Sequence, residues 1–139
     1  MPAALALLNG RTPHRFTGIY RYDVEMLRNV ALFDRFNPEL RSGADVAMED
    51  AYCAIVGHTG QPLEFADART DPHVQHLPGS PVVCYCGVLI SAPDGSPFGT
   101  LCHFDLQLCE MRTGDLPLLQ AAAPLIYAAV QSLAGARAE

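Results

Sequence analysis

The apolar run Val82–Ala92 (VVCYCGVLISA) constrains the fold more than any other segment. It is followed by Pro93–Ser96 (PDGS) and then by Pro97–Asp105 (PFGTLCHFD). Proline, aspartate and glycine favour tight turns, so this order predicts a β-hairpin. A strand that is apolar on both faces is typical of a sheet covered on both sides. We therefore predict that the hairpin Val82–Asp105 lies inside the sheet and is its most buried part.

The flanking segments predict the rest of a single domain. The other expected strands are Phe16–Asp23, Met26–Phe33 and Gln61–Ala68, and the expected helices are Pro2–Asn9, Asp45–His58 and Leu116–Ala136. Asp45 or Asp50 is expected to cap the middle helix, and Pro124 to kink the last one. These elements predict an α+β domain with an antiparallel central β-sheet, terminal helices on one face and a helix with loops on the other.

Length and charge exclude several classes of protein. A chain of 139 residues, 50% hydrophobic and only 17% charged, fits one globular domain, here residues 1–139 with a core at about 17–133. The net charge is −6, and the basic residues are scattered arginines, so no nucleic-acid partner is expected. Neither a membrane span nor a signal peptide is expected, which favours a cytoplasmic protein.

The five cysteines are odd in number and lack a secretory context, which argues against a disulfide framework. A metal site could draw on Cys84, Cys86, Cys102, His103 and Cys109. Strand alternation puts Cys102 and His103 on opposite faces, however, and a C-x-C inside a strand is unlike a zinc knuckle. We therefore expect buried reduced thiols and no metal site. Likewise, we expect no catalytic set, and no motif specifies a cofactor.

Several segments together resemble the GAF domain, a small sensory module related to PAS domains. The segments are Asp50–His58, Pro62–Ala68, Asp67–Pro72 (DARTDP), Tyr85–Leu89, Asp94–Gly95 and Gly99–Asp105 (GTLCHFD). The similarity spans Thr17–Leu133, and Leu89 departs from it where many members carry proline. The resemblance implies a ligand cavity between the central sheet and the layer made of Asp45–His58 and Asp67–Ser80.

The residues expected around that cavity come from the middle helix, a strand end, the following loop and the central strand. They are Tyr52, Cys53, Asp67, Asp71, His73 and Tyr85. Asp67 and Asp71 could equally serve their own loop as turn-forming residues. Gly87 leaves room in the central strand for either a ligand or a neighbouring side chain. If Tyr85 faced the terminal helices instead, Cys84 and Cys86 would line the cavity.

Three functional hypotheses follow from the resemblance. The first is a small-molecule-binding sensory domain that acts in signal transduction without catalysis, as a homodimer through its terminal helices or through a partner signalling protein. The second is a thiol-dependent redox enzyme on the same fold, similar to free methionine sulfoxide reductases, in which Cys53 would react. The third is a degenerate GAF module used only for dimerisation.

Overall fold

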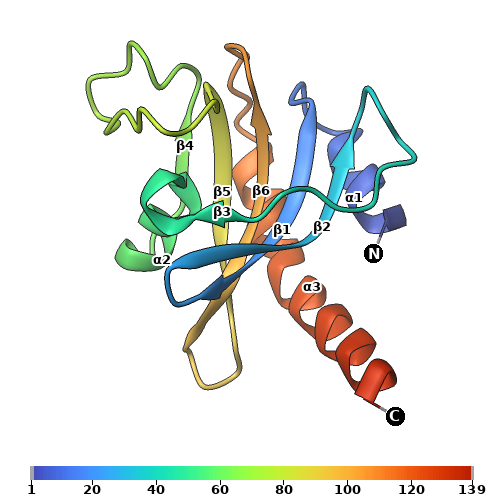
Figure 1. Ribbon diagram of the computed structural model, residues 1–139. Helices are drawn as coiled ribbons and strands as arrows, with labels where there is room; N and C mark the ends of the chain where they lie inside the picture. Colours follow the sequence, from blue (N-terminus) through green and yellow to red (C-terminus); the bar gives the residue numbers. More distant parts are fainter. Residues whose placement is uncertain (1, 139) are drawn as a thin grey trace.

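The computed structural model describes residues 2–138 and is built on a six-stranded antiparallel sheet in the order β3-β2-β1-β6-β5-β4 (Figure 1). The strands are β1 (Phe16–Asp23), β2 (Met26–Asp34), β3 (Val46–Ala47), β4 (Leu63–Phe65), β5 (Cys84–Ser91) and β6 (Pro97–Asp105). The helices are α1 (Pro2–Asn9), α2 (Tyr52–Thr59) and α3 (Asp115–Ala138), and one 3-10 turn covers Met48–Asp50. The expected α+β class is confirmed.

The β5–β6 hairpin lies inside the sheet, as predicted. β1 pairs with β6 on one side, and β4 pairs with β5 on the other. The turn between the two strands contains Gly95 with φ of +87°, a conformation that glycine adopts without strain. Every residue of β5 from Cys84 to Val88 is buried, and so is the β6 stretch from Gly99 to His103. The hairpin is therefore shielded on both faces.

The terminal helices α1 and α3 pack on the same face of the sheet (Figure 1), which agrees with the expected arrangement. Alternate residues of β5 point toward them, beginning with Cys86 and Val88. The buried residues of this layer are Leu5, Leu8, Ile19, Ala31, Cys86, Val88, Ile90, Leu101, Leu119, Ala123 and Ile126. This cluster is the main aliphatic core of the domain.

The other face of the sheet carries α2 and the loops, and its core is rich in aromatic residues. The buried residues there are Tyr20, Leu27, Ala51, Tyr52, Cys53, Val56, Phe65, Ala68, Leu77, Tyr85 and Cys102. Because strand residues alternate between faces, Tyr85 lies here while its neighbours Cys84 and Cys86 lie on the opposite side.

The middle helix is shorter than predicted, because it starts at Tyr52 and not near Asp45. Val46–Ala47 pairs with β2 instead, and the carboxylate of Asp45 accepts a hydrogen bond from the backbone N–H of Asn29. Ala51 occupies the N-cap position without a side-chain hydrogen bond, so neither Asp45 nor Asp50 caps α2. Strand pairing in this segment overrides its local helical preference.

The strand predicted at Gln61–Ala68 is also shorter in the structure, where β4 covers only Leu63–Phe65.

Helix α3 is more apolar than the sequence analysis allowed. Its stretch Asp115–Ala134 has a mean hydropathy of 1.4 and is long enough, by length and composition alone, to cross a membrane. Alanines between the leucines raise the hydropathy of this stretch without any long run of large apolar residues, and the expectation of no membrane span stays a prediction. One helix of this kind is weak evidence for a membrane protein, since a core helix of a soluble protein can have the same length and hydropathy. Only 17% of its most apolar window is buried, and Leu118, Leu125 and Leu133 are exposed.

The two-sided burial of β6 predicts a large cost for truncating its central leucine. Leu101 is fully buried beneath the terminal helices, so Leu101→Ala should lower the free energy of unfolding by about 2–5 kcal/mol. Leu108→Ala is the matched control, because that side chain is 62% exposed and its loss should change stability by less than about 0.5 kcal/mol. Urea denaturation of both variants measures the difference, and equal effects would contradict the burial described here.

Candidate functional site

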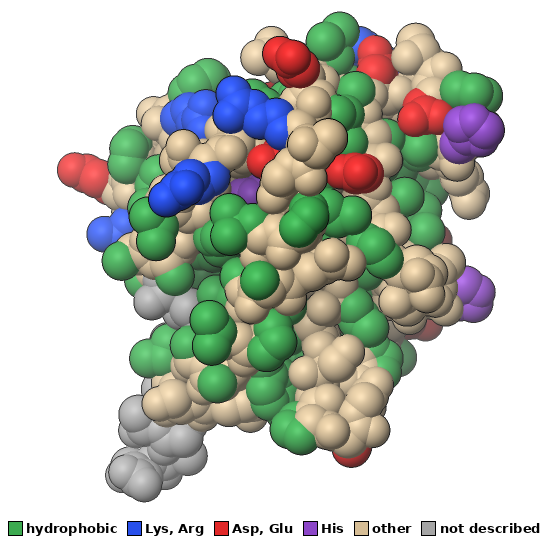
Figure 2. All heavy atoms as spheres, turned by 180° about the vertical axis from the view of Figure 1, so that it is seen from behind, with side chains coloured by type: hydrophobic (Ala, Val, Ile, Leu, Met, Phe, Trp, Pro, Cys, Tyr) green, Lys and Arg blue, Asp and Glu red, His purple; other side chains and the backbone are tan. Residues whose placement is uncertain are grey.

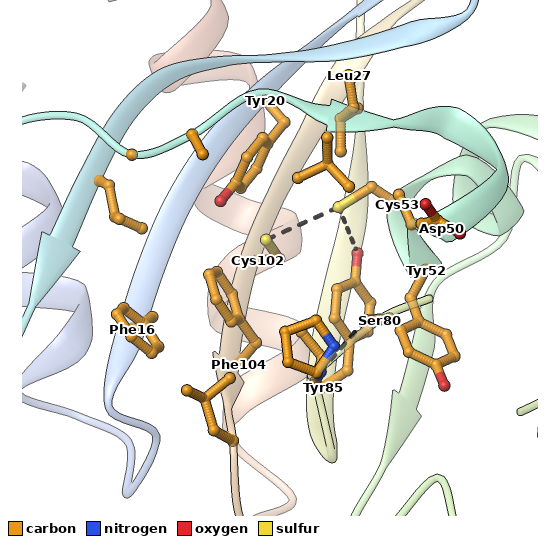
Figure 3. A pocket seen from close by; sticks show the side chains of 18 residues that line it. Phe16, Tyr20, Leu27, Asp50, Tyr52, Cys53, Ser80, Tyr85, Cys102 and Phe104 are labelled. Carbon is orange, nitrogen blue, oxygen red and sulfur yellow. Dashed lines mark hydrogen bonds between the residues drawn. The ribbon is translucent and has the colours of Figure 1, made fainter. Parts of the chain in front are cut away.

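A cavity of about 250 Å³ lies between the sheet and the layer formed by α2 and its flanking loops (Figure 3). Its floor comes from β1, β5 and β6, and its rim comes from residues 43–53 and 80–82. The lining residues are Phe16, Tyr20, Leu27, Leu32, Gly43, Ala44, Val46, Asp50, Ala51, Tyr52, Cys53, Ser80, Pro81, Val82, Tyr85, Cys102, Phe104 and Leu106. The wall is almost wholly apolar, with Asp50 and Ser80 supplying polar groups at its edge.

Stacked aromatic rings make the wall of this cavity rigid. Phe16 stacks on Phe104 with ring centroids 4.8 Å apart, and Tyr20 lies 6.4 Å from the same Phe104 ring. On the other side, Tyr52 lies 6.0 Å from Tyr85. Aromatic rings in contact are held by both their buried area and their ring geometry, so these side chains form a pre-shaped surface.

Tyr85 faces the cavity because Gly87 leaves room for its ring. A Cβ atom on Gly87 would collide with the hydroxyl of Tyr85, which stands over that backbone position. The free space at Gly87 therefore serves a neighbouring side chain and not a ligand. Tyr85 cannot move aside easily, because its ring also stacks on Phe65 with centroids 5.8 Å apart.

A small thiol cluster lies in the same wall. The Sγ atom of Cys53 is 3.1 Å from the hydroxyl oxygen of Tyr85 and 3.9 Å from the Sγ atom of Cys102 (Figure 3). Tyr22 donates a hydrogen bond of 2.7 Å to the backbone carbonyl of Cys53, which fixes the start of α2 against β1. Both thiols are therefore positioned by secondary structure and lie on the cavity surface.

The two thiols have different acidities. Burial raises the pKa of Cys53, but the nearby side chains of Cys102, Thr100 and Tyr85 stabilise its thiolate and bring the net pKa below the ordinary value. The contact with Cys53, together with burial, holds the pKa of Cys102 well above its ordinary value. Thr100 has a buried hydroxyl with no hydrogen-bond partner among residues 2–138, so it is free to donate to a thiolate. Cys53 is the more acidic thiol.

Burial, reinforced by the two thiols, also raises the pKa of Tyr85 well above its ordinary value, so this phenol stays neutral at physiological pH. Its hydroxyl can therefore act as a hydrogen-bond donor toward Cys53. The lining therefore offers apolar surface, hydrogen-bonding groups at the rim and two thiols.

Three of the six residues expected at the site line the cavity, namely Tyr52, Cys53 and Tyr85. The hydroxyl of Tyr52 also accepts a hydrogen bond from the backbone N–H of Leu77 and so holds the loop that covers the site. These positions make the three residues available to a ligand, and binding by them stays a prediction.

The other three expected residues lie in the loop after β4 and do not line this cavity. Asp67 forms an ion pair with Arg69 at 2.9 Å, which lowers the pKa of Asp67, and it also accepts the Arg69 backbone N–H. Asp71 accepts the backbone N–H of His73, whose side chain is exposed. In the structure the two carboxylates thus shape their own loop, the alternative that the sequence left open.

Sequence reasoning missed the residues that close the cavity. Cys102 and Phe104 could have been found from the hairpin register, because Tyr85 pairs with Phe104 and residues two apart share a face. No local signal marks Asp50 or Ser80. Asp50 reaches the site because its carboxylate packs against the backbone at Gly79, a contact between distant segments.

Comparisons with known proteins rest on structure, since neither a protein-family model nor a curated protein matches this sequence. The GAF domain of an Acinetobacter phosphoenolpyruvate-protein phosphotransferase superposes with a TM-score of 0.73 at 12% identity, over 98% of this chain and 82% of that one. A type II free methionine-R-sulfoxide reductase from Thermoplasma acidophilum gives a TM-score of 0.72 at 18% identity, over 95% and 90% of the two chains.

A further match is the free methionine-R-sulfoxide reductase of Neisseria meningitidis, solved in complex with its substrate. Its TM-score is 0.70 at 15% identity, over 97% of this chain and 78% of that one. The chain has the GAF fold. At these identities the comparisons establish the GAF fold alone, and that fold is shared by sensor domains and by reductases.

The Gly87 contact generates a direct test of the site. Gly87→Ala should displace the Tyr85 ring and lower the free energy of unfolding by about 1–3 kcal/mol, the usual cost of overpacking. Gly114→Ala is the control, because a Cβ atom there meets open space. Urea denaturation measures stability, and nuclear magnetic resonance shifts of the Tyr85 ring report its displacement. An unchanged Tyr85 environment in Gly87→Ala would contradict this account.

Proposed function

We propose that this chain is a cytoplasmic sensory domain that binds a small apolar molecule in the cavity and acts in signal transduction without catalysis. The observation that carries the proposal is the preformed, aromatic-walled cavity of about 250 Å³. Small-molecule sites are typically concave and apolar, with a few polar groups that orient the ligand. The five free, buried cysteines fit a reducing compartment, which supports the cytoplasmic location.

The lining favours a compact, ring-containing ligand. Tyr20 and Phe104 offer ring surface to a ligand, whereas the Phe16 ring is already covered by Phe104 and by the guanidinium of Arg15. The volume is small for a nucleotide or a tetrapyrrole. The carboxylate of Asp50 at the rim favours a ligand that carries a hydrogen-bond donor or a positive charge. An aromatic amine combines both properties.

Ligand binding is tested with indole and tryptamine as probes, by saturation-transfer nuclear magnetic resonance, and with native mass spectrometry of the freshly purified protein. We expect both probes to bind and tryptamine to bind more tightly. Ala44→Trp should abolish binding, because Ala44 lies exposed at the rim and a large ring there fills the mouth. Ala92→Trp, in the β5–β6 turn, is the control and should bind normally.

Replacement of Asp50 separates the contribution of its carboxylate to ligand binding from the contribution of the aromatic rings. Asp50→Asn should remove the preference for tryptamine and leave indole binding unchanged. If neither probe binds and no retained molecule is found, the proposed sensory function is wrong, and the dimerisation-only hypothesis becomes the better one.

The proposed route for the signal is a homodimer formed through the terminal helices. Leu118 and Leu125 lie seven residues apart on α3 and are 38% and 73% exposed, with exposed alanines at Ala121 and Ala128 between and after them. This spacing forms one apolar stripe along the helix, and small residues in it allow close helix approach. Figure 2 shows hydrophobic side chains spread over this side of the molecule.

Light scattering at high micromolar protein concentration tests this assembly. We expect a dimer for the wild-type chain and a monomer for Leu125→Glu, because a charge cannot be buried unpaired in an apolar contact. Leu108→Glu, at another strongly exposed leucine outside the helices, should remain dimeric. A wild-type monomer at that concentration would count against the dimer without affecting the proposal of ligand binding.

A second candidate is thiol redox chemistry in the same cavity, favoured by the 3.9 Å approach of Cys53 and Cys102. Two thiols can reduce a sulfoxide to a thioether, with release of water and formation of a disulfide between the two sulfurs. The test is reduction of free methionine sulfoxide with dithiothreitol as the final reductant. Turnover lost in Cys53→Ser and kept in Cys86→Ser would establish it, because Cys86 lies on the opposite face of the sheet.

A further inference from the structure

Three potential metal ligands from distant segments meet at one end of the sheet, on the face opposite the cavity. His14 precedes β1, Cys84 is the first residue of β5, and Cys109 follows β6. The Nε2 atom of His14 lies 3.0 Å from the Sγ atom of Cys84, and the three ligand atoms all lie within 4.8 Å of one another. All three side chains are buried. We propose that His14, Cys84 and Cys109 bind a zinc ion.

Asp105 is the candidate for a fourth ligand, although its Oδ2 atom also accepts a hydrogen bond of 3.0 Å from the backbone N–H of Arg15. The Oδ2 atom of Asp105 lies 3.6 Å from the Sγ atom of Cys109, and Asp105 pairs with Cys84 across β5 and β6. Zinc bound at about 2.0–2.3 Å by four tetrahedral ligands keeps those ligand atoms about 3.3–3.8 Å apart. The ligand atoms of His14, Cys84 and Cys109 lie within 4.8 Å of one another, at most about 1 Å wider than that spacing, and Asp105 must turn toward them to complete the site.

The histidine is held in the tautomer that a metal needs. The hydroxyl of Thr12 donates a hydrogen bond of 2.9 Å to the carboxylate of Asp115, so its only proton is engaged there. Thr12 must therefore accept the 2.6 Å hydrogen bond from His14, which places the imidazole proton on Nδ1. The lone pair of Nε2 then points at the thiols. Zinc-binding histidines usually donate the other ring N–H to a hydrogen-bond acceptor, and here Thr12 is that acceptor and links His14 to the carboxylate of Asp115.

The donor set selects the metal. Two thiolates, one imidazole and one carboxylate form a borderline-soft set that suits Zn²⁺ better than Mg²⁺ or Ca²⁺. Cys86, among the aliphatic side chains under α3, pairs across the strands with His103, but the Nδ1 atom of His103 is hydrogen-bonded to Thr17 and no group of three ligands forms there among the described residues. The expectation of no metal site was based on cysteines and His103 alone. His103 instead bonds to Thr17 at 2.7 Å, and the missing ligand is His14, seventy residues before Cys84.

Zinc titration of the full chain, stripped with a chelator under reducing conditions, tests the proposal. We expect one Zn²⁺ per chain by native mass spectrometry and a higher melting temperature with metal. Co²⁺ in place of Zn²⁺ should give the sulfur-to-cobalt charge-transfer absorption and the intense visible bands of a tetrahedral site. The absorption identifies thiolate ligands directly, without any measurement of function.

Variants distinguish this site from other thiols. Cys109→Ser should weaken Zn²⁺ binding by more than about 100-fold, and Thr12→Val by about 10–100-fold through the released imidazole. Cys86→Ser is the matched control, a buried cysteine two residues from Cys84, and should bind normally. Circular dichroism confirms that each variant is folded. Cys109 is chosen for replacement because Cys84 lies inside the sheet, where its replacement could prevent folding. No binding by the wild-type chain, or equal binding by Cys109→Ser, would overturn the proposal.

Discussion

The burial of β5 and β6 on both faces is the constraint on which the rest of the structure depends. Each residue of β5 must suit one of two layers, so Cys86, Val88 and Ile90 meet the helices while Tyr85 meets α2 and the loops. Apolar burial is worth about 25 cal/mol per Å², and a two-sided strand gains it along its whole length. The pairing of β5 with β6 positions the aliphatic core, the aromatic cavity and the cluster of His14, Cys84 and Cys109 at one end of the sheet.

The cavity exists because bulky rings meet on a curved surface that they cannot fill. The Tyr85 ring lies over the backbone of Gly87, and the Phe104 ring stacks on Phe16. These contacts keep both rings in the wall of the cavity and out of its interior. The space opens at the rim beside Ala44, so its apolar wall meets water when no ligand is bound. A ligand that covers this preformed aromatic surface removes that apolar area from water.

Sequence patterns predicted the features that depend on near neighbours. The strand Phe16–Asp23 and the helix Pro2–Asn9 follow their local periodicity and appear as expected, and the strand expected at Met26–Phe33 ends one residue later, at Asp34. The predicted start of α2 was wrong, because Val46–Ala47 forms backbone hydrogen bonds with β2 and does not join the helix. At the site, the predicted residues Tyr52, Cys53 and Tyr85 line the cavity. Asp50 and Ser80 were not predicted, because they lie in separate segments that only the tertiary structure brings together.

The two faces of β5 also define how occupancy of the cavity could reach the surface. A ligand that touches Tyr85 contacts β5 directly, and the opposite face of that strand supports Leu119 and Ala123 of α3. Helix α3 is buried along one side, and its other side carries exposed leucines. Transmission requires an element with two arrangements that both sites bias. Within the proposed sensory function, α3 is the element that would have to shift, because its inner side rests on the ligand-contacting strand while its outer stripe forms the proposed dimer contact.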